Sequence, residues 1–113
     1  LPNVKFLGRK NSIEISKYLN KSEYAIFPSL YENFPLVGLE AMACGAITIA
    51  SNTGFNEYIK DGYNGFIFES DNIESISGLL NEPTVKIIEN AKETSKNYTI
   101  KLAAKRYLET IKV

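Results

Sequence analysis

Short apolar runs and amphipathic segments alternate along the 113 residues of this chain. The apolar runs predict strands over residues 4–7, 24–27, 47–50 and 65–68, because each is short and bounded by turn residues. Helical spacing predicts helices over residues 12–20, 35–45 and 55–60, and from residue 72 onward with breaks at residues 82–83 and near residue 97. Strand and helix therefore alternate with short connections, which indicates an α/β fold with a mainly parallel sheet and C-terminal helices.

Single residues mark where the predicted helices begin and end. Asn11 or Ser12 can cap the first helix. Pro35 suits the first turn of the second helix, because proline has no N–H to leave unpaired there, and Gly45 is a natural end for it. The buried side of the first helix is expected to consist of Ile13, Ile15, Tyr18 and Leu19.

The composition is that of a globular protein, with 44% apolar and 23% charged residues, and the length suits one domain with a single core. Thirteen basic and thirteen acidic residues cancel, so no net charge favours nucleic acid or an acidic membrane as a partner. The single cysteine, Cys44, excludes an internal disulfide. Because the chain has no histidine, it has no Cys/His or Ser/His catalytic pair, and we expect no metal site.

No signal peptide or transmembrane segment is visible. The longest apolar run, residues 34–50, is interrupted by Glu40 and Gly45 and falls short of the roughly 20 residues that a span needs. We therefore expect a cytoplasmic protein, or one at the cytoplasmic face of a membrane. The chain has no initiator Met and leads directly into a strand-like segment, so we interpret it as a piece of a longer protein.

The run over residues 34–50 contains the most informative side chain of the sequence. Glu40 is its only charge, and Glu32 lies eight residues upstream. A carboxylate among apolar residues is expected to be partly desolvated, which is costly unless something hydrogen-bonds it. The two glutamates and the turn between them are therefore the first candidates for a functional site.

The predicted fold gives these glutamates a chemical setting. In an open α/β sheet, ligands bind at the carboxyl ends of the strands, and the strand over residues 24–27 leads there into residues 28–33. The next helix begins at about residues 34–37, and a helix N-terminus attracts anions such as phosphate without help from basic side chains. Leu36, Glu40 and Ala43 share one face of that helix, so Glu40 can accept hydrogen bonds from a vicinal diol such as a ribose. The spacing suggests a nucleoside diphosphate carrying a polyhydroxylated group.

Spacing alone leaves structural alternatives open. Glu40 could be paired with a lysine or a backbone amide, and Glu32 could be a surface residue or a partner for the helix dipole. The aromatic rings of Tyr31, Phe34 and Phe55 are more often loop anchors than ligand stackers.

The residues around both glutamates resemble a known family. The string FPSLYENFPLVGLEAMACG, residues 27–45, resembles the E-x7-E signature of retaining glycosyltransferase family 4 (glycosyl transferases group 1), which has the GT-B fold. Residues 3–8 resemble the strand and turn that precede this signature, and residues 49–68 resemble the segment that follows it. The resemblance extends over about residues 3–82 in the family's order.

The resemblance implies that residues 1–113 are a partial Rossmann-like, three-layer αβα domain, the C-terminal donor-binding domain of a GT-B enzyme, incomplete at its N-terminal side. Glu40 would hold the ribose hydroxyls. Glu32 would be the catalytic residue, at the donor sugar, where it would help bind the sugar hydroxyls or support the developing positive charge. The remaining donor-binding residues would be Phe34, Pro35, Leu36 and Val37 at the sugar and diphosphate, and Gly8, Arg9 and Lys10 at the base.

Family members transfer sugar with retention and without an essential metal, so no cofactor is expected and the nucleoside-diphosphate sugar is the donor substrate. The implied reaction moves a hexose to a glycan or lipid-linked acceptor, bound through an N-terminal domain outside these residues, as in bacterial surface polysaccharide synthesis. Peripheral membrane association of the full-length protein is a further expectation. The 113 residues alone are expected to be inactive. The rival interpretations are a non-catalytic nucleotide-binding or regulatory module and a nucleotide-sugar epimerase of GT-B architecture.

Several positions depart from the family's pattern, among them Ala46-Ile47 in place of a usual proline-valine, and two of them concern the donor site. Pro35 stands where a glycine N–H often approaches the donor, and proline cannot donate there. Phe55 stands where a second glycine often follows Gly54, a position from which its ring could narrow the donor pocket.

Overall fold

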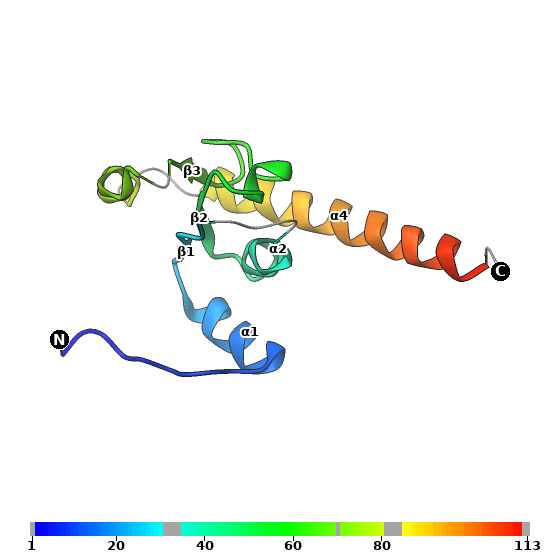
Figure 1. The fold of residues 1–113 in the computed structure, drawn as a ribbon, viewed down its shortest axis with the longest axis horizontal. Coiled ribbons are helices and arrows are strands. Elements are labelled where there is room, and N and C mark those ends of the chain that lie inside the picture. Colours follow the sequence, from blue (N-terminus) through cyan, green and yellow to red (C-terminus); the bar gives the residue numbers. More distant parts are fainter. Residues whose placement is uncertain (1, 31–34, 70, 81–84, 112–113) are drawn as a thin grey trace.

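The computed structural model describes residues 2–30, 35–69, 71–80 and 85–111, with side chains described as far as residue 102. Figure 1 shows the arrangement of their helices and strands. In chain order these are α1 (Ser12–Lys21), β1 (Tyr24–Phe27), α2 (Leu36–Ala43), β2 (Ile47–Ser51), η1 (Phe55–Glu57), β3 (Phe66–Phe68), η2 (Ile73–Ser75), α3 (Ile76–Leu79) and α4 (Val85–Ile111).

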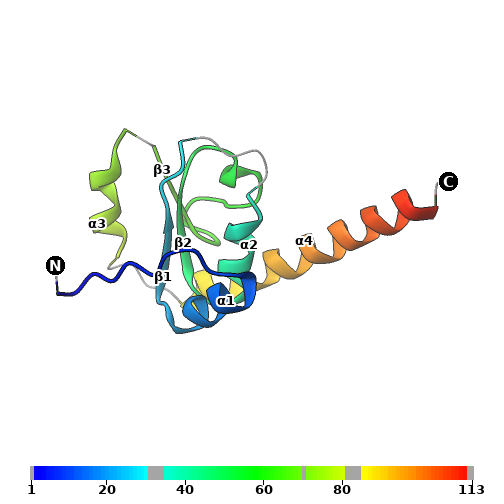
Figure 2. The same cartoon turned by 60° about the horizontal axis from the view of Figure 1, so that its bottom comes forward.

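The sheet is parallel, with the order β1-β2-β3 among the described strands. Ile26 of β1 lies opposite Ile49 of β2, and Ala50 of β2 lies opposite Ile67 of β3. Parallel neighbours require crossover connections, and Figure 2 shows α3 on one side of the strands and α2 on the other. The predicted α/β fold, with helices on both faces of a parallel sheet and at the C-terminal end, is confirmed.

The core lies on both faces of β2, whose five residues are all buried. Ala50 faces α2, while Ile47 and Ile49 face the α3 side, as the alternation of a strand requires. One cluster contains Leu39, Met42, Ala50, Phe55, Tyr58, Ile59 and Ala91. The other contains Ile47, Ile49, Phe66, Phe68, Ile76 and Ile87. Because α4 contributes to both clusters, its first turns join the two layers.

Beyond those turns, α4 runs past the body of the molecule (Figure 1). The predicted break near Asn97 is wrong, because α4 continues from Val85 to Ile111. Side chains next to Asn97 hold this stretch in place: Ser95 donates to the Leu39 carbonyl at 3.0 Å and Tyr98 donates to the Glu57 carbonyl at 2.9 Å. These tertiary contacts outweigh the modest helix propensity of asparagine. The predicted break at residues 82–83 lies outside the described residues.

The prediction of a strand over residues 4–7 is wrong. The segment pairs with none of the described strands, and Phe6 is 95% exposed. Apolar alternation favours a strand only where a neighbouring strand supplies hydrogen bonds and a face to cover.

The first helix begins as predicted but buries less than expected. Asn11 caps it, and the Asn11 side chain and Glu14 form a reciprocal capping box. Of the predicted buried side, Ile13 and Tyr18 are exposed, and only Leu19 packs against a core cluster. The predicted helix over residues 55–60 shortens to the single 3-10 turn of η1.

Candidate functional site

The N-terminus of α2 lies at the carboxyl edge of the sheet, after β1. Pro35 is its N-cap, with φ −77° and ψ 101°, and no side chain of that residue caps the helix. The first N–H groups of a helix have no partner within it, and the helix dipole makes them electropositive. The first turn of α2 contains no acidic residue that would neutralise this end. The predicted start of the helix near Pro35 is confirmed, and its N-terminus suits an anionic ligand.

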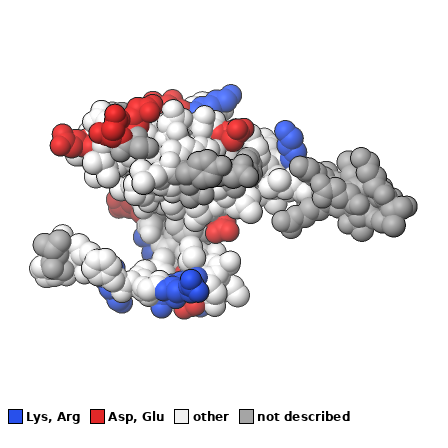
Figure 3. All heavy atoms as spheres, in the orientation of Figure 1, with Lys and Arg blue, Asp and Glu red and all other residues white. Residues whose placement is uncertain are grey.

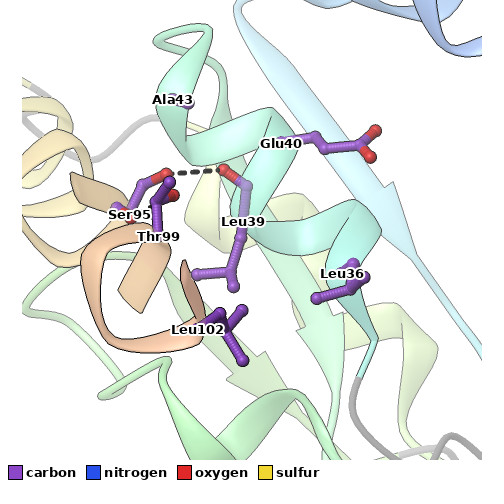
Figure 4. A pocket seen from close by; sticks show the side chains of 7 residues that line it. All are labelled: Leu36, Leu39, Glu40, Ala43, Ser95, Thr99 and Leu102. Atoms are coloured by element: carbon purple, nitrogen blue, oxygen red, sulfur yellow. Dashed lines mark hydrogen bonds between the residues drawn. The ribbon is translucent and has the colours of Figure 1, made fainter. Parts of the chain in front are cut away.

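The two faces of α2 serve different purposes. Gly38, Leu39, Ala41 and Met42 are buried against the sheet and α4. Leu36, Glu40 and Ala43 line a groove of about 530 Å³ between α2 and α4, together with Leu39 and the α4 residues Ser95, Thr99 and Leu102 (Figure 4). The prediction that Leu36, Glu40 and Ala43 share one face is thus confirmed.

Glu40 is exposed, so the prediction that its carboxylate is partly desolvated is wrong. Only one side of the apolar helix is buried, and residue 40 falls on the other side. Figure 4 shows the Glu40 side chain extending away from α4 and the rest of the groove. Among the described residues, no group forms a hydrogen bond or an ion pair with this carboxylate, which argues against the pairing alternatives. The carboxylate is open to hydrogen-bond donors of a ligand.

Two of the predicted site residues, Glu32 and Phe34, lie outside the described residues, as does Tyr31. The residues on either side of segment 31–34 are anchored. The Ser29 carbonyl accepts hydrogen bonds from the Ser51 hydroxyl at 2.6 Å and the Thr53 hydroxyl at 3.1 Å. On the other side, the Pro35 carbonyl accepts a hydrogen bond from the Tyr58 hydroxyl.

Sequence reasoning missed these three hydroxyl groups. Ser51 and Thr53 could have been found, because polar residues directly after a buried strand point to the carboxyl edge of the sheet. Tyr58 gave no such signal, since the sequence predicts only a short helix at residues 55–60 and does not tell in which direction the tyrosine ring points.

Of the predicted donor-binding residues at the start of α2, Pro35 and Val37 have side chains turned toward the core. Val37 packs its side chain against the core cluster on the α2 side, while Leu36 is exposed. Pro35 is buried. Any contact from Pro35 or Val37 to a ligand would therefore come from the main chain.

The predicted base-binding loop lies just before α1. Gly8 adopts a left-handed conformation, with φ 71°, and Arg9 is exposed. Lys10 forms an ion pair with Glu14 at 3.8 Å. The structure brings α1 against α2 near its C-terminal end, where the Cys44 thiol lies 4.0 Å from the Ser16 carbonyl.

Phe55 lies in the core and does not line the groove between α2 and α4. It is fully buried, and its ring stacks on Phe27 with the ring centroids 5.5 Å apart. Gly54, with φ 114°, turns the chain so that the ring enters the core. The anchoring alternative is therefore correct for this aromatic residue.

The charged side chains are unevenly distributed over the described surface. In Figure 3 acidic side chains gather at the upper left, where Figure 1 places the segment after β3; Glu69, Asp71 and Glu74 are exposed there. The sequence has no Lys or Arg between Ser22 and Tyr58. An anion at the N-terminus of α2 would meet backbone N–H groups and the helix dipole, and no basic side chain from residues 22–58.

The described part of the chain contains neither a metal centre nor a membrane span. Within residues 2–30, 35–69, 71–80 and 85–102, no three His, Cys, Asp or Glu side chains are placed to hold a metal ion together. None of the described helices has a stretch long and apolar enough to cross a bilayer.

A parallel α/β sheet with a helix N-terminus at its carboxyl edge is a common arrangement in nucleotide-binding domains. Comparison with known proteins identifies the family. Residues 1–101 match the family described as "Glycosyl transferases group 1", and the chain belongs to this family.

The similar proteins are glycosyltransferases from several organisms. An uncharacterized glycosyltransferase of Methanocaldococcus jannaschii is 35% identical over 106 residues, which cover 88% of this chain and 30% of that protein. The N,N'-diacetylbacillosaminyl-diphospho-undecaprenol alpha-1,3-N-acetylgalactosaminyltransferase of Campylobacter jejuni is 32% identical, over 94% of this chain and 30% of its own length. The chain thus spans about a third of these relatives.

Among solved structures, Anabaena HepE in complex with UDP-glucose superposes on this chain with a TM-score of 0.74 at 28% identity. The match covers 96% of this chain and 32% of HepE.

Proposed function

We propose that this chain is the donor-binding part of a retaining, family-4 glycosyltransferase that moves a hexose from a nucleoside-diphosphate sugar to a glycan or lipid-linked acceptor. The diphosphate would lie at the N-terminus of α2, and Glu40 would accept hydrogen bonds from the ribose hydroxyls. Residues 1–113 would form the C-terminal domain of the enzyme, with the acceptor bound through another domain.

One observation carries the proposal: the Glu40 carboxylate, which is exposed and has no partner among the described residues, lies four residues after the first residue of α2. Four residues of helix correspond to roughly 6 Å along the axis, which is comparable to the separation of a ribose from the phosphate next to it. The groups that recognise an anion and a diol are therefore presented by one short helix.

The relatives support the same interpretation. HepE was crystallised with UDP-glucose, and the Campylobacter relative is named as acting on an undecaprenol-linked acceptor. A role in bacterial surface polysaccharide synthesis, at the cytoplasmic face of the membrane, is therefore part of the proposal.

The chemistry would depend on electrostatic stabilisation. The leaving phosphate would accept the proton of the acceptor hydroxyl. The acceptor oxygen would attack the sugar from the face that the diphosphate leaves, through an oxocarbenium-like transition state, so that the anomeric configuration is retained. Glu32 would support the developing positive charge from the loop between β1 and α2. The helix N-terminus would stabilise the departing diphosphate, so the reaction is proposed to need neither a metal nor a protein nucleophile.

The test uses the full-length protein with Glu40 changed to Gln. This change keeps the shape of the side chain but weakens its acceptor strength toward a diol, since hydrogen bonds to charged groups are stronger than neutral ones. We expect the dissociation constant for the preferred nucleotide among UDP, GDP and ADP to rise about tenfold by calorimetry, and the transfer rate at low donor to fall similarly.

The matched control is Glu23→Gln. Glu23 is also exposed, but it precedes β1 and so lies at the opposite edge of the sheet. If Glu40→Gln binds and transfers like the wild type, the assignment of Glu40 to the donor site is wrong. A wild-type protein that binds nucleotide without transferring sugar would favour the regulatory module, and release of a free epimer would favour the epimerase.

A further inference from the structure

Two backbone carbonyls between β1 and α2, those of Ser29 and Pro35, accept hydrogen bonds from one stretch of the chain, residues 51–58. Residues 51–58 supply the hydroxyl groups of Ser51 and Thr53, which donate to the Ser29 carbonyl, and the hydroxyl of Tyr58, which donates to the Pro35 carbonyl. The carbonyls of Ser29 and Pro35 are therefore fixed by Ser51, the last residue of β2, and by Thr53 and Tyr58, which follow it. The bond from Tyr58 acts directly on the N-cap of α2.

Tyr58 is itself firmly placed. It is 3% exposed, and its ring lies edge-on to Tyr98 with the centroids 5.9 Å apart. Its backbone carbonyl accepts a hydrogen bond from the buried Asn64 side chain at 2.9 Å, and the same side chain accepts one from the Lys60 N–H at 2.8 Å. A hydroxyl held in this way has little freedom to follow α2 if the helix shifts.

The helix approaches Tyr58 at a glycine. A Cβ atom built on Gly38 would overlap the Tyr58 hydroxyl and would lie 3.0 Å from Cζ of the same ring. Glycine therefore permits the first turn of α2 to lie directly on the tyrosine.

The direction of the first helical N–H follows from this contact. The Pro35 carbonyl and the Leu36 N–H belong to one planar, trans peptide group, so they point in opposite directions. Because the carbonyl points to the buried Tyr58 hydroxyl, the Leu36 N–H points away from the core. Pro35 has no N–H, which makes the Leu36 N–H the first donor of α2.

We infer that Tyr58 is a positioning residue for donor binding: by holding the Pro35 carbonyl, its hydroxyl aims the Leu36 N–H at the diphosphate of the nucleotide sugar. This inference rests on the function proposed above and assigns a role to a residue that does not touch the substrate. The hydroxyl acts through a single peptide group. Its removal should therefore lower the affinity for the diphosphate and leave the affinity for the nucleoside unchanged.

The test is Tyr58→Phe in the full-length protein. We expect the dissociation constant for the preferred nucleoside diphosphate to rise about fivefold to tenfold, as for a weakened hydrogen bond to a charged group, while the affinity for the corresponding nucleoside stays within about twofold of wild type. In the transfer assay, kcat/KM for the donor should fall by at least the same factor, because the Leu36 N–H would contact the diphosphate both in the bound donor and as it departs.

Tyr98→Phe is the matched control. It removes a hydroxyl from the neighbouring ring, but that hydroxyl donates to the Glu57 carbonyl and not to the N-cap of α2. Its affinities for nucleoside and diphosphate should match the wild type.

The possible outcomes separate the positioning role from the proposed function. If Tyr58→Phe binds the diphosphate like the wild type, or loses affinity for nucleoside and diphosphate equally, the positioning role is refuted and the proposed function stands. If the wild type itself binds no nucleoside diphosphate, the proposed function fails, and the positioning role fails with it.

Discussion

The contact between Gly38 and Tyr58 predicts a strong coupling between two substitutions. Gly38→Ala places a methyl group where the Tyr58 hydroxyl lies, with Cζ of the same ring at 3.0 Å and Cδ1 of Phe55 at 3.1 Å. The added methyl must displace the tyrosine or the helix. The hydroxyl can then no longer reach the Pro35 carbonyl.

Three terms give the expected magnitude. Alanine in place of glycine inside a helix favours folding by about 1 kcal/mol. Overpacking of a closely packed core typically costs about 1–3 kcal/mol. Loss of the hydrogen bond to Pro35 costs about 1 kcal/mol more. Gly38→Ala should therefore lower the free energy of unfolding by about 1–3 kcal/mol, although the same change is usually stabilising in a helix.

The second substitution separates these terms. In a Tyr58→Phe background the hydroxyl and its hydrogen bond are already absent, and the alanine methyl meets only the ring carbons. Gly38→Ala should then cost less than about 1 kcal/mol, which gives a coupling energy of about 1–2 kcal/mol in the double-mutant cycle. Equilibrium urea unfolding, followed by circular dichroism for all four proteins, measures the free energies.

A control glycine is available in α3. A Cβ on Gly78 would meet nothing within 4 Å, so Gly78→Ala should be neutral or stabilising by up to about 1 kcal/mol. The reasoning is refuted if Gly38→Ala is as stable as Gly78→Ala, or if its cost is the same with and without the Tyr58 hydroxyl.

Two further predictions concern single polar groups. Among the described residues, the buried Thr48 hydroxyl has no hydrogen-bond partner, so Thr48→Val should raise the free energy of unfolding by about 1 kcal/mol; Thr94→Val, which removes a hydroxyl bonded to Asn64 and Asn90, should lower it in the same urea experiment. Asn11→Ala removes the cap of α1 and should cost about 1 kcal/mol in thermal unfolding, whereas Asn20→Ala in the same helix should cost almost nothing; equal melting temperatures for these two variants would contradict the role of the cap.

The sequence predicts best those parts of the fold in which a local pattern allows one kind of structure. The strands of residues 24–27, 47–50 and 65–68 match β1, β2 and β3 within one residue at each end, because short apolar runs bounded by turn residues are typical of strands. Of these three, β2 is buried along its whole length, as a central strand of a parallel sheet should be. Gly45, with φ 86°, ends α2 in the left-handed conformation that glycine adopts easily. Val4, Phe6 and Ile13 show the opposite case, since these apolar side chains are exposed and a local pattern cannot reveal whether another element covers them.

The candidate site was predictable to the level of the helix but not of the side chain. Helical spacing placed Leu36, Glu40 and Ala43 on one face, yet it could not tell whether that face was buried or exposed. Which face of α2 is buried depends on the packing of Leu39 and Met42 against Phe55. Phe55 lies beyond β2 in the sequence, so the spacing within the helix does not reveal this contact. That packing leaves Glu40 on the exposed side of α2, without a partner among the described residues.

The core and the candidate site are therefore physically connected through α2. Gly38 is the least favourable helix former apart from proline, and a helix of eight residues has few other contacts with which to offset that cost. The close approach that glycine allows brings the Pro35 carbonyl within reach of Tyr58. The same packing turns Glu40 outward. A change in the core at Phe55 or Tyr58 should thus alter how the first turn of α2 meets a ligand, even though neither residue faces the groove.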